Sequence, residues 1–166
     1  TSDAQTAVNL AYRTPETLGA DRLANAVALS RVCGPLSGCI DAGTATKVDV
    51  LDGEGLYLGG AILPGLATAF RSLVQGTAML FDVPLVPPER AIGRSSEECL
   101  RSGAFWSHVD AINGMAKRAE SELGAPIRWV LTGGLAAALA PYVVGGSEAL
   151  PTWTLDGIRL AFESKP

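Results

Sequence analysis

The chain has 166 residues, of which 48% are hydrophobic and 18% are charged, and its formal net charge is −4. This length fits one domain with a substantial core, and this composition excludes disorder over the whole chain. The acidic balance and the scattered Lys and Arg residues argue against nucleic-acid binding, and no apolar run reaches membrane-spanning length. We therefore expect a soluble, cytoplasmic protein without a nucleic-acid or membrane partner.

Residues 1–11 are expected to be a tail or the remnant of a connection, and residues 12–166 to be one lobe. Within this lobe, a helix is predicted in the first quarter of the chain. Thr14-Pro15-Glu16 is typical of a helix start, because Pro is tolerated in the first turn and an acid suits the positive end of the helix dipole. The helix should run to about Ser30, with an apolar stripe of Ala20, Leu23, Ala24 and Val27.

Residues 38–58 predict a β-hairpin that carries a possible ligand site. A strand is expected through Asp41-Ala42-Gly43-Thr44-Ala45-Thr46 and onward to Leu51; Asp52-Gly53 then supplies a turn, and Leu56-Tyr57-Leu58 returns. The Asp41 carboxylate could hold a cation. Gly43 would let phosphate oxygens approach the backbone, within reach of the Thr44 hydroxyl. The alternative is a structural Asp-x-Gly-Thr turn that binds no ligand.

The next segment predicts two helices separated by a loop. Helical spacing of apolar residues extends over 66–74, and the prolines between 84 and 88 favour an extended loop. Ser95 and Glu98 have the spacing of a capping box, which would open a long helix to about Leu123.

The last part of the chain completes the alternation of strands and helices. Residues 127–131 are a buried-strand candidate that leads into the turn Thr132-Gly133-Gly134. Helices are expected over 135–139 and from Thr154 onward. Helices that alternate with a hairpin and a strand predict a layered α/β domain.

Cysteine and histidine chemistry is not favoured. Cys33, Cys39 and Cys99 lack the spacing of a zinc site, so reduced and mostly buried thiols are expected. His108 is the only histidine and lies on a predicted helix, where packing or solvation is the expected role, and this argues against a His-based catalytic triad.

Two motifs in order resemble type III pantothenate kinases: Tyr12 followed by residues 15–25, and then Asp41–Thr46. Further matches follow at residues 57–65, 92–96, 102–103 and 131–134. The resemblance implies an actin-like (ribonuclease H-like) lobe of the actin, hexokinase and Hsp70 superfamily, with a mixed sheet, a β-hairpin and flanking helices. It also implies ATP-dependent phosphorylation of pantothenate, the first step of coenzyme A synthesis.

The resemblance implies roles on the pantothenate side of the site. Asp21 matches the catalytic base, and the charge of Arg22 beside it is expected to keep it ionised. Gly19, Ala20, Asp21, Arg22 and Tyr12 would contact pantothenate, with Arg22 suited to its carboxylate. Ser96 stands where the family has a substrate-contacting Thr, and retains only its hydroxyl.

On the ATP side, Asp41 matches a ligand for a monovalent cation, K⁺ or NH₄⁺, and Thr44 with Gly43 matches a phosphate contact. Thr132, Gly133 and Gly134 would line the adenosine side, where a helix N-terminus would favour anionic groups. Magnesium would accompany ATP. The family is dimeric, and the apolar segments 66–80 and 105–115 could supply the contact or be ordinary core.

The pattern departs from the family at its beginning. The Asp-x-Gly-Asn-Thr phosphate loop of the first lobe is absent from these 166 residues, so we expect a C-terminal lobe, either a fragment or a divergent product, that is inactive or nearly so alone. One alternative is a non-catalytic regulatory protein of the same fold. Another is a lobe of a sugar or acetate kinase, in which the acid would not be expected in a Gly-Ala-Asp-Arg segment.

Overall fold

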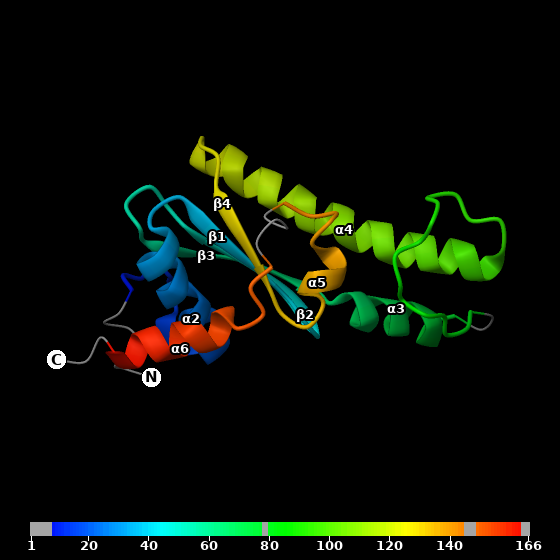
Figure 1. The fold of residues 1–166 in the computed structure, drawn as a ribbon, viewed down its shortest axis with the longest axis horizontal. Coiled ribbons are helices and arrows are strands. Elements are labelled where there is room, and N and C mark those ends of the chain that lie inside the picture. Colours follow the sequence, from blue (N-terminus) through cyan, green and yellow to red (C-terminus); the bar gives the residue numbers. More distant parts are fainter. Residues whose placement is uncertain (1–7, 78–79, 145–148, 164–166) are drawn as a thin grey trace.

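A mixed four-stranded sheet with helices on both faces forms the centre of the computed structural model (Figure 1), which describes residues 8–77, 80–144 and 149–163. The strand order is β3-β2-β1-β4. The first three strands pair antiparallel, and β4 pairs parallel to β1. The predicted α/β class is confirmed. The strands are β1 (Ser37–Ala42), β2 (Ala45–Leu51), β3 (Tyr57–Pro64) and β4 (Arg128–Thr132).

The predicted single strand over 38–51 is wrong, because the chain reverses at Gly43-Thr44 between β1 and β2. Asp41 therefore lies opposite Lys47 in the ladder. Side chains alternate between the two faces with the same period before and after this turn, and the turn contains neither Pro nor Asn-Gly. The sequence pattern therefore gives little indication of the reversal. The second predicted reversal is confirmed at Asp52, whose carboxylate accepts backbone hydrogen bonds from Glu54 and Leu56 at 2.8 and 2.9 Å.

One face of the sheet is covered by α2 (Ala20–Ala28) and α6 (Trp153–Glu163). The predicted helix over 14–30 is wrong at its start, since a 3-10 turn η1 (Pro15–Thr17) is followed by Gly19, whose ψ of 144° is not helical. Its end is extended by a π-helical turn η2 (Leu29–Cys33). The break at Gly19 places Asp21 in the first turn of α2.

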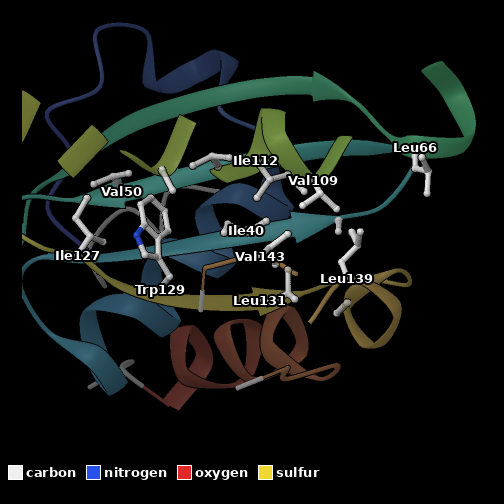
Figure 2. Close-up of a cluster of buried hydrophobic side chains, with 14 of the residues drawn as sticks. Ile40, Val50, Leu66, Val109, Ile112, Ile127, Trp129, Leu131, Leu139 and Val143 are labelled. Carbon is white, nitrogen blue, oxygen red and sulfur yellow. The ribbon is translucent and has the colours of Figure 1, made fainter. Parts of the chain in front are cut away.

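The opposite face is covered by α4 (Ser96–Leu123) and the single turn α5 (Ala136–Leu139). Figure 2 shows Ile40, Val109 and Ile112 side by side in this larger hydrophobic cluster. The predicted start of α4 is confirmed, because the Ser95 hydroxyl accepts a hydrogen bond from the Glu98 amide. Residues 105–115 are one of the two segments that could supply a dimer contact. Phe105, Val109 and Ile112 of this segment belong to the hydrophobic cluster, so the segment contributes largely to the core.

An arm formed by α3 (Leu66–Gln75), the first half of α4 and the loop between them extends beyond the sheet (Figure 1). The predicted helix over 66–74 is confirmed. A small cluster of Phe70, Val83 and Leu100 holds the arm together. Large apolar side chains remain exposed on it, at Leu73, Phe81, Val86 and Ile92.

The chain before η1 contacts the sheet. The Tyr57 amide donates to the Asn9 carbonyl, and the Ala11 amide donates to the Tyr57 carbonyl, at 2.9 and 3.0 Å. Part of the segment expected to be a tail is thus bonded to the edge of β3. That residues 1–11 belong to an inter-lobe connection stays a prediction, and residues 1–7 lie outside the described part of the chain.

The described residues contain no disulfide. Cys33, Cys39 and Cys99 are not bridged, and burial raises the pKa of the Cys39 thiol well above its usual value. None of the described helices combines the length and apolar character needed to cross a bilayer.

We predict that His108 makes stability depend on pH. His108 is buried on α4, with Nε2 3.2 Å from Thr46 Oγ1, and burial lowers its pKa below the usual 6.5. The unfolded chain then binds a proton more readily, so this contribution to stability is present above pH 6.5 and is lost as pH falls towards the folded pKa. Between about pH 7.5 and about pH 5.5, the unfolding temperature should fall more for the wild type than for His108→Gln. Equal falls for both proteins would contradict the prediction.

Candidate active site

Three charged side chains, Asp21, Asp41 and Lys47, form what we call the carboxylate–lysine cluster. Lys47 Nζ donates to Asp21 Oδ2 at 2.6 Å and to Asp41 Oδ2 at 3.1 Å. Asp41 and Lys47 are paired across β1 and β2, so their side chains leave the same face of the sheet, and the first turn of α2 brings Asp21 above them. The two predicted carboxylates therefore lie at one site, joined by a lysine that the motif reading missed.

The charges in this cluster depend on one another. Partial burial acts to raise the pKa of Asp21, but hydrogen bonds from Lys47 and from the Arg22 amide, together with the charge of Lys47, outweigh it and lower that pKa. Burial likewise acts to lower the pKa of Lys47, and the two carboxylates raise it instead. Both side chains are thus charged at neutral pH, and Asp21 stays 46% exposed. Arg22 helps to keep Asp21 ionised through its backbone amide, which donates to Asp21 Oδ1 at 2.8 Å, and not through its charge as expected, because the guanidinium is bonded to Asp49.

Arg22 forms a buried ion pair with Asp49 on the same face of the sheet. Its Nε and Nη2 donate to Asp49 Oδ1 at 2.9 and 2.7 Å, and the Tyr57 hydroxyl donates to the same oxygen at 2.6 Å. The two ionised side chains are only 8% and 0% exposed. Burial raises the pKa of Asp49 against the opposing effect of Arg22 and Tyr57. Within the described part of the chain, Asp49 Oδ2 is buried without a hydrogen-bond partner.

Tyr12 lies against this ion pair. Its ring centroid is 5.6 Å from the guanidinium carbon of Arg22, and its hydroxyl is 3.5 Å from Arg22 Nη1. Gly19 caps α2 and Ala20 opens it, both exposed beside Asp21. The predicted pantothenate residues on α2 and Tyr12 are therefore neighbours, whereas the guanidinium expected to meet the substrate carboxylate is already bonded to Asp49.

The turn after β4 meets the cluster at Asp41. Parallel pairing places Asp41 opposite Thr132, and the Leu135 amide donates to the Ala42 carbonyl at 3.0 Å. The Thr132 hydroxyl donates to the Leu150 carbonyl at 2.7 Å, and the side chain is buried. The hydroxyl hydrogen of Thr132 is thus already donated to another residue of the same lobe. The predicted helix over 135–139 is confirmed as the single turn α5, and a role of its N-terminus towards anionic groups stays a prediction.

The predicted nucleotide-side glycines Gly134 and Gly43 differ in the space beside them, which is open only at Gly134. A Cβ on Gly134 would have no heavy atom outside its chain neighbours within 4 Å, and one on Gly43 would meet its nearest atom at 3.6 Å. Thr44 is exposed, and its carbonyl accepts from the Gly65 amide at 3.0 Å and the Thr68 hydroxyl at 2.8 Å. These contacts hold the β1–β2 turn in place.

Ser96 is not part of this cluster within a single chain. It is the exposed first residue of α4, on the arm at the opposite end of the molecule from α2 (Figure 1). The remaining predicted site residues gather around the carboxylate–lysine cluster.

We predict that Gly133→Ala destabilises the lobe, whereas Gly134→Ala does not. At Gly133 the φ of +94° is unfavourable for other residues, and a Cβ would lie 2.5 Å from the Ala42 carbonyl oxygen and 2.7 Å from Asp41 Oδ1. The free energy of unfolding should fall by about 1–3 kcal/mol. Gly134→Ala is the matched control, with an expected change within about 0.5 kcal/mol. Denaturant unfolding measures both, and equal effects would contradict the packing of Gly133 on Asp41.

The two residues that the motif reading missed leave different signals. Asp49 is an acid within the apolar run 48–51, which is itself an indication of a buried partner. Lys47 could be found only if the turn at Gly43-Thr44 were recognised. That turn sets the register of β1 against β2, and the register places Lys47 opposite Asp41.

Comparisons with known proteins agree with the motifs. Residues 1–118 match the type III pantothenate kinase family. A type III pantothenate kinase of Thermomicrobium roseum is 42% identical over 149 residues, which are 90% of this chain and 58% of that protein. One of Moorella thermoacetica is 35% identical over 159 residues, 96% of this chain and 63% of that protein. The chain spans about three-fifths of the length of these curated relatives.

A solved structure from Campylobacter jejuni, described as belonging to the Baf family of transcriptional activators, has a similar fold. Its TM-score is 0.61 at 21% sequence identity, covering 96% of this chain and 70% of that one. At this identity the likeness concerns the fold alone.

Proposed function

Because the chain belongs to the type III pantothenate kinase family, we propose that it supplies the pantothenate side of a kinase that phosphorylates this vitamin with ATP. The product would be 4'-phosphopantothenate, the first intermediate of coenzyme A synthesis. The observation that carries the proposal is the carboxylate–lysine cluster, which brings the predicted base Asp21 and the predicted phosphate-side acid Asp41 to one charged site.

Asp21 would accept the proton of the pantothenate hydroxyl. It is the more exposed carboxylate of the cluster, and Lys47 keeps it ionised at neutral pH. A lowered pKa makes Asp21 a weak base, so its first role would be to orient the hydroxyl towards the γ-phosphoryl group. In a loose transition state the nucleophile needs little deprotonation before the phosphoryl group moves, and such a base suffices.

ATP would approach the edge formed by the turns at Gly43-Thr44 and Gly133-Gly134. Open space beside Gly134 and the exposure of Thr44 support this placement, since phosphate oxygens need close access to the chain. Among the described residues, no three His, Cys, Asp or Glu side chains are grouped closely enough to hold a metal ion. Mg²⁺ bound with ATP would neutralise charge on the phosphates, and phosphate oxygens would be its main ligands.

Pantothenate would lie against Tyr12, Gly19 and Ala20, next to Asp21. Its carboxylate would have to share Arg22 with Asp49, which is bonded to Nε and Nη2, whereas Nη1 faces the Tyr12 hydroxyl. A bound carboxylate would therefore add to an existing ion pair rather than create one.

A homodimer is part of the same proposal. Ser96 lies too far along α4 to reach Asp21 of its own chain, and the arm that carries it exposes Leu73, Phe81, Val86 and Ile92. An apolar patch of this kind is typical of an interaction surface. Covering it with a second copy would let Ser96 contact pantothenate bound to the partner. A cytoplasmic location also belongs to the proposal, supported by the lack of a disulfide among the described residues.

Phosphoryl transfer to pantothenate tests the proposal directly. The natural gene product that contains this sequence, and the 166-residue chain itself, would be incubated with labelled ATP and pantothenate, glucose or acetate. We expect phosphorylation of pantothenate alone by the gene product and little activity from the 166-residue chain. Calorimetry with pantothenate and with ATP separates the alternatives, because binding of neither ligand would favour the regulatory protein.

A further inference from the structure

The Asp41 carboxylate already has a cation beside it. Lys47 Nζ lies 3.1 Å from Asp41 Oδ2, which is hydrogen-bonding distance for an ammonium and a carboxylate. By resemblance, Asp41 is the residue that would hold K⁺ or NH₄⁺. A side-chain ammonium therefore stands where the sequence motif predicts a free monovalent cation.

The position of Lys47 is set by the fold rather than by a flexible surface contact. Its backbone lies directly opposite Asp41 in the β1–β2 ladder, between the buried residues Thr46 and Val48. A second carboxylate, Asp21, accepts from the same Nζ at 2.6 Å, and the Lys47 side chain is only 20% exposed. Two acids on two elements thus hold the ammonium from both sides.

A second cation at Asp41 would meet both charge and ligand problems. It would lie within a few ångströms of the Lys47 ammonium and be repelled by it, in a setting shielded only partly from water. A cluster of acidic ligands is also lacking, since the described residues contain no group of three His, Cys, Asp or Glu side chains that could hold a metal ion. A free ion at Asp41 would thus have to compete with the Lys47 ammonium for the carboxylate.

We propose that Lys47 Nζ takes the place of the monovalent cation predicted at Asp41, so that this site uses neither K⁺ nor NH₄⁺. The inference rests on the proposed function, because only the resemblance makes Asp41 a cation ligand. Lys47 is then a positioning residue that keeps Asp21 and Asp41 together and supplies a fixed positive charge near the transferred phosphoryl group. Cation independence would be built into the chain.

Thallium(I), a K⁺ surrogate with an NMR-active nucleus, provides a test that does not need turnover. The natural gene product would be titrated with thallium(I) and, separately, heated in KCl or in tetramethylammonium chloride at equal ionic strength. We expect no thallium site in the wild type that Asp41→Asn removes, and the same unfolding temperature in both salts. Thallium binding that depends on Asp41 in the wild type would overturn the proposal.

Removing the ammonium should create the cation site. Lys47→Met keeps the aliphatic stem but leaves Asp41 open, so it should gain thallium binding that the double variant Lys47→Met/Asp41→Asn loses. Its unfolding temperature should rise by about 2–4 °C in about 100 mM K⁺ relative to tetramethylammonium. Lys117→Met is the matched control on the exposed surface of α4 and should behave as the wild type. A folded Lys47→Met without thallium binding would show that Asp41 is no cation site and would overturn the proposal.

Turnover gives a separate readout. If the gene product phosphorylates pantothenate, its rate should change less than about twofold when tetramethylammonium replaces K⁺, and a larger stimulation by K⁺ would overturn the inference. If it phosphorylates nothing, the proposed function fails, while the thallium titration still decides whether Lys47 occupies the cation position. The two failures are therefore distinguishable.

Discussion

Asp21→Asn is expected to lower kcat for pantothenate phosphorylation by about 10²–10⁴-fold in the natural gene product. The amide has the shape of the carboxylate and can still accept a hydrogen bond from Lys47, but it cannot take the proton of the attacking hydroxyl. Stability should change little, because Asp21 is 46% exposed. Steady-state kinetics with pantothenate and thermal unfolding measure the two effects together.

Asp156→Asn provides the control for this experiment. Asp156 lies on α6, is 42% exposed, accepts a hydrogen bond from the Thr152 hydroxyl and pairs with Arg159 of the same helix. The same change of charge and shape there should leave kcat within about twofold of the wild type. If Asp21→Asn retained wild-type turnover, Asp21 would not be the base, and the proposed mechanism would have to be abandoned.

Arg22→Met should destabilise the protein by about 3–5 kcal/mol, the largest stability effect that we predict. Removal of the guanidinium would leave the Asp49 carboxylate buried with only the Tyr57 hydroxyl as a partner. Ionised Asp49 would then be expensive to bury, and the raised pKa of this acid already reflects that burial. Denaturant unfolding at neutral pH measures the loss.

Asp49→Asn turns this prediction into a double-mutant cycle. In the wild type it should lower stability, because Arg22 loses its counter-charge inside the protein. In the Arg22→Met background it should raise stability, because the amide removes the unpaired charge and can still accept from Tyr57. If Asp49→Asn were equally destabilising in both backgrounds, the two side chains would not be coupled. A double variant that regains stability while KM for pantothenate stays high would support contact between Arg22 and the substrate.

These two experiments concern adjacent but different parts of the same helix turn. Asp21 is exposed and bonded to Lys47, whereas Arg22, the next residue, is buried and bonded to Asp49. The Gly-Ala-Asp-Arg segment therefore combines an exposed acid, for which we propose a role towards the substrate, with a residue that fixes α2 to the sheet. A motif of consecutive functional residues need not mean that each of them contacts substrate.

Much of the architecture could be predicted from local patterns alone. The Ser95 cap of α4, the turn at Asp52 and the strand before Thr132 were all confirmed, because each depends on neighbouring residues only. The motifs around Asp21 and Asp41 were sufficient to indicate the family, which the relatives then established. The amino-acid sequence by itself thus determined the class of fold, the family and the two carboxylates of the site.

Only the tertiary structure decided which charges meet. The reversal at Gly43-Thr44 keeps a period of two on both sides, so the pairing of Asp41 with Lys47 depends on the register of β1 against β2. The partner of Asp49 depends on where α2 docks on the sheet, which follows from packing between segments distant in sequence. Ion pairs between distant residues are set by the folded arrangement, and no local pattern contains that information.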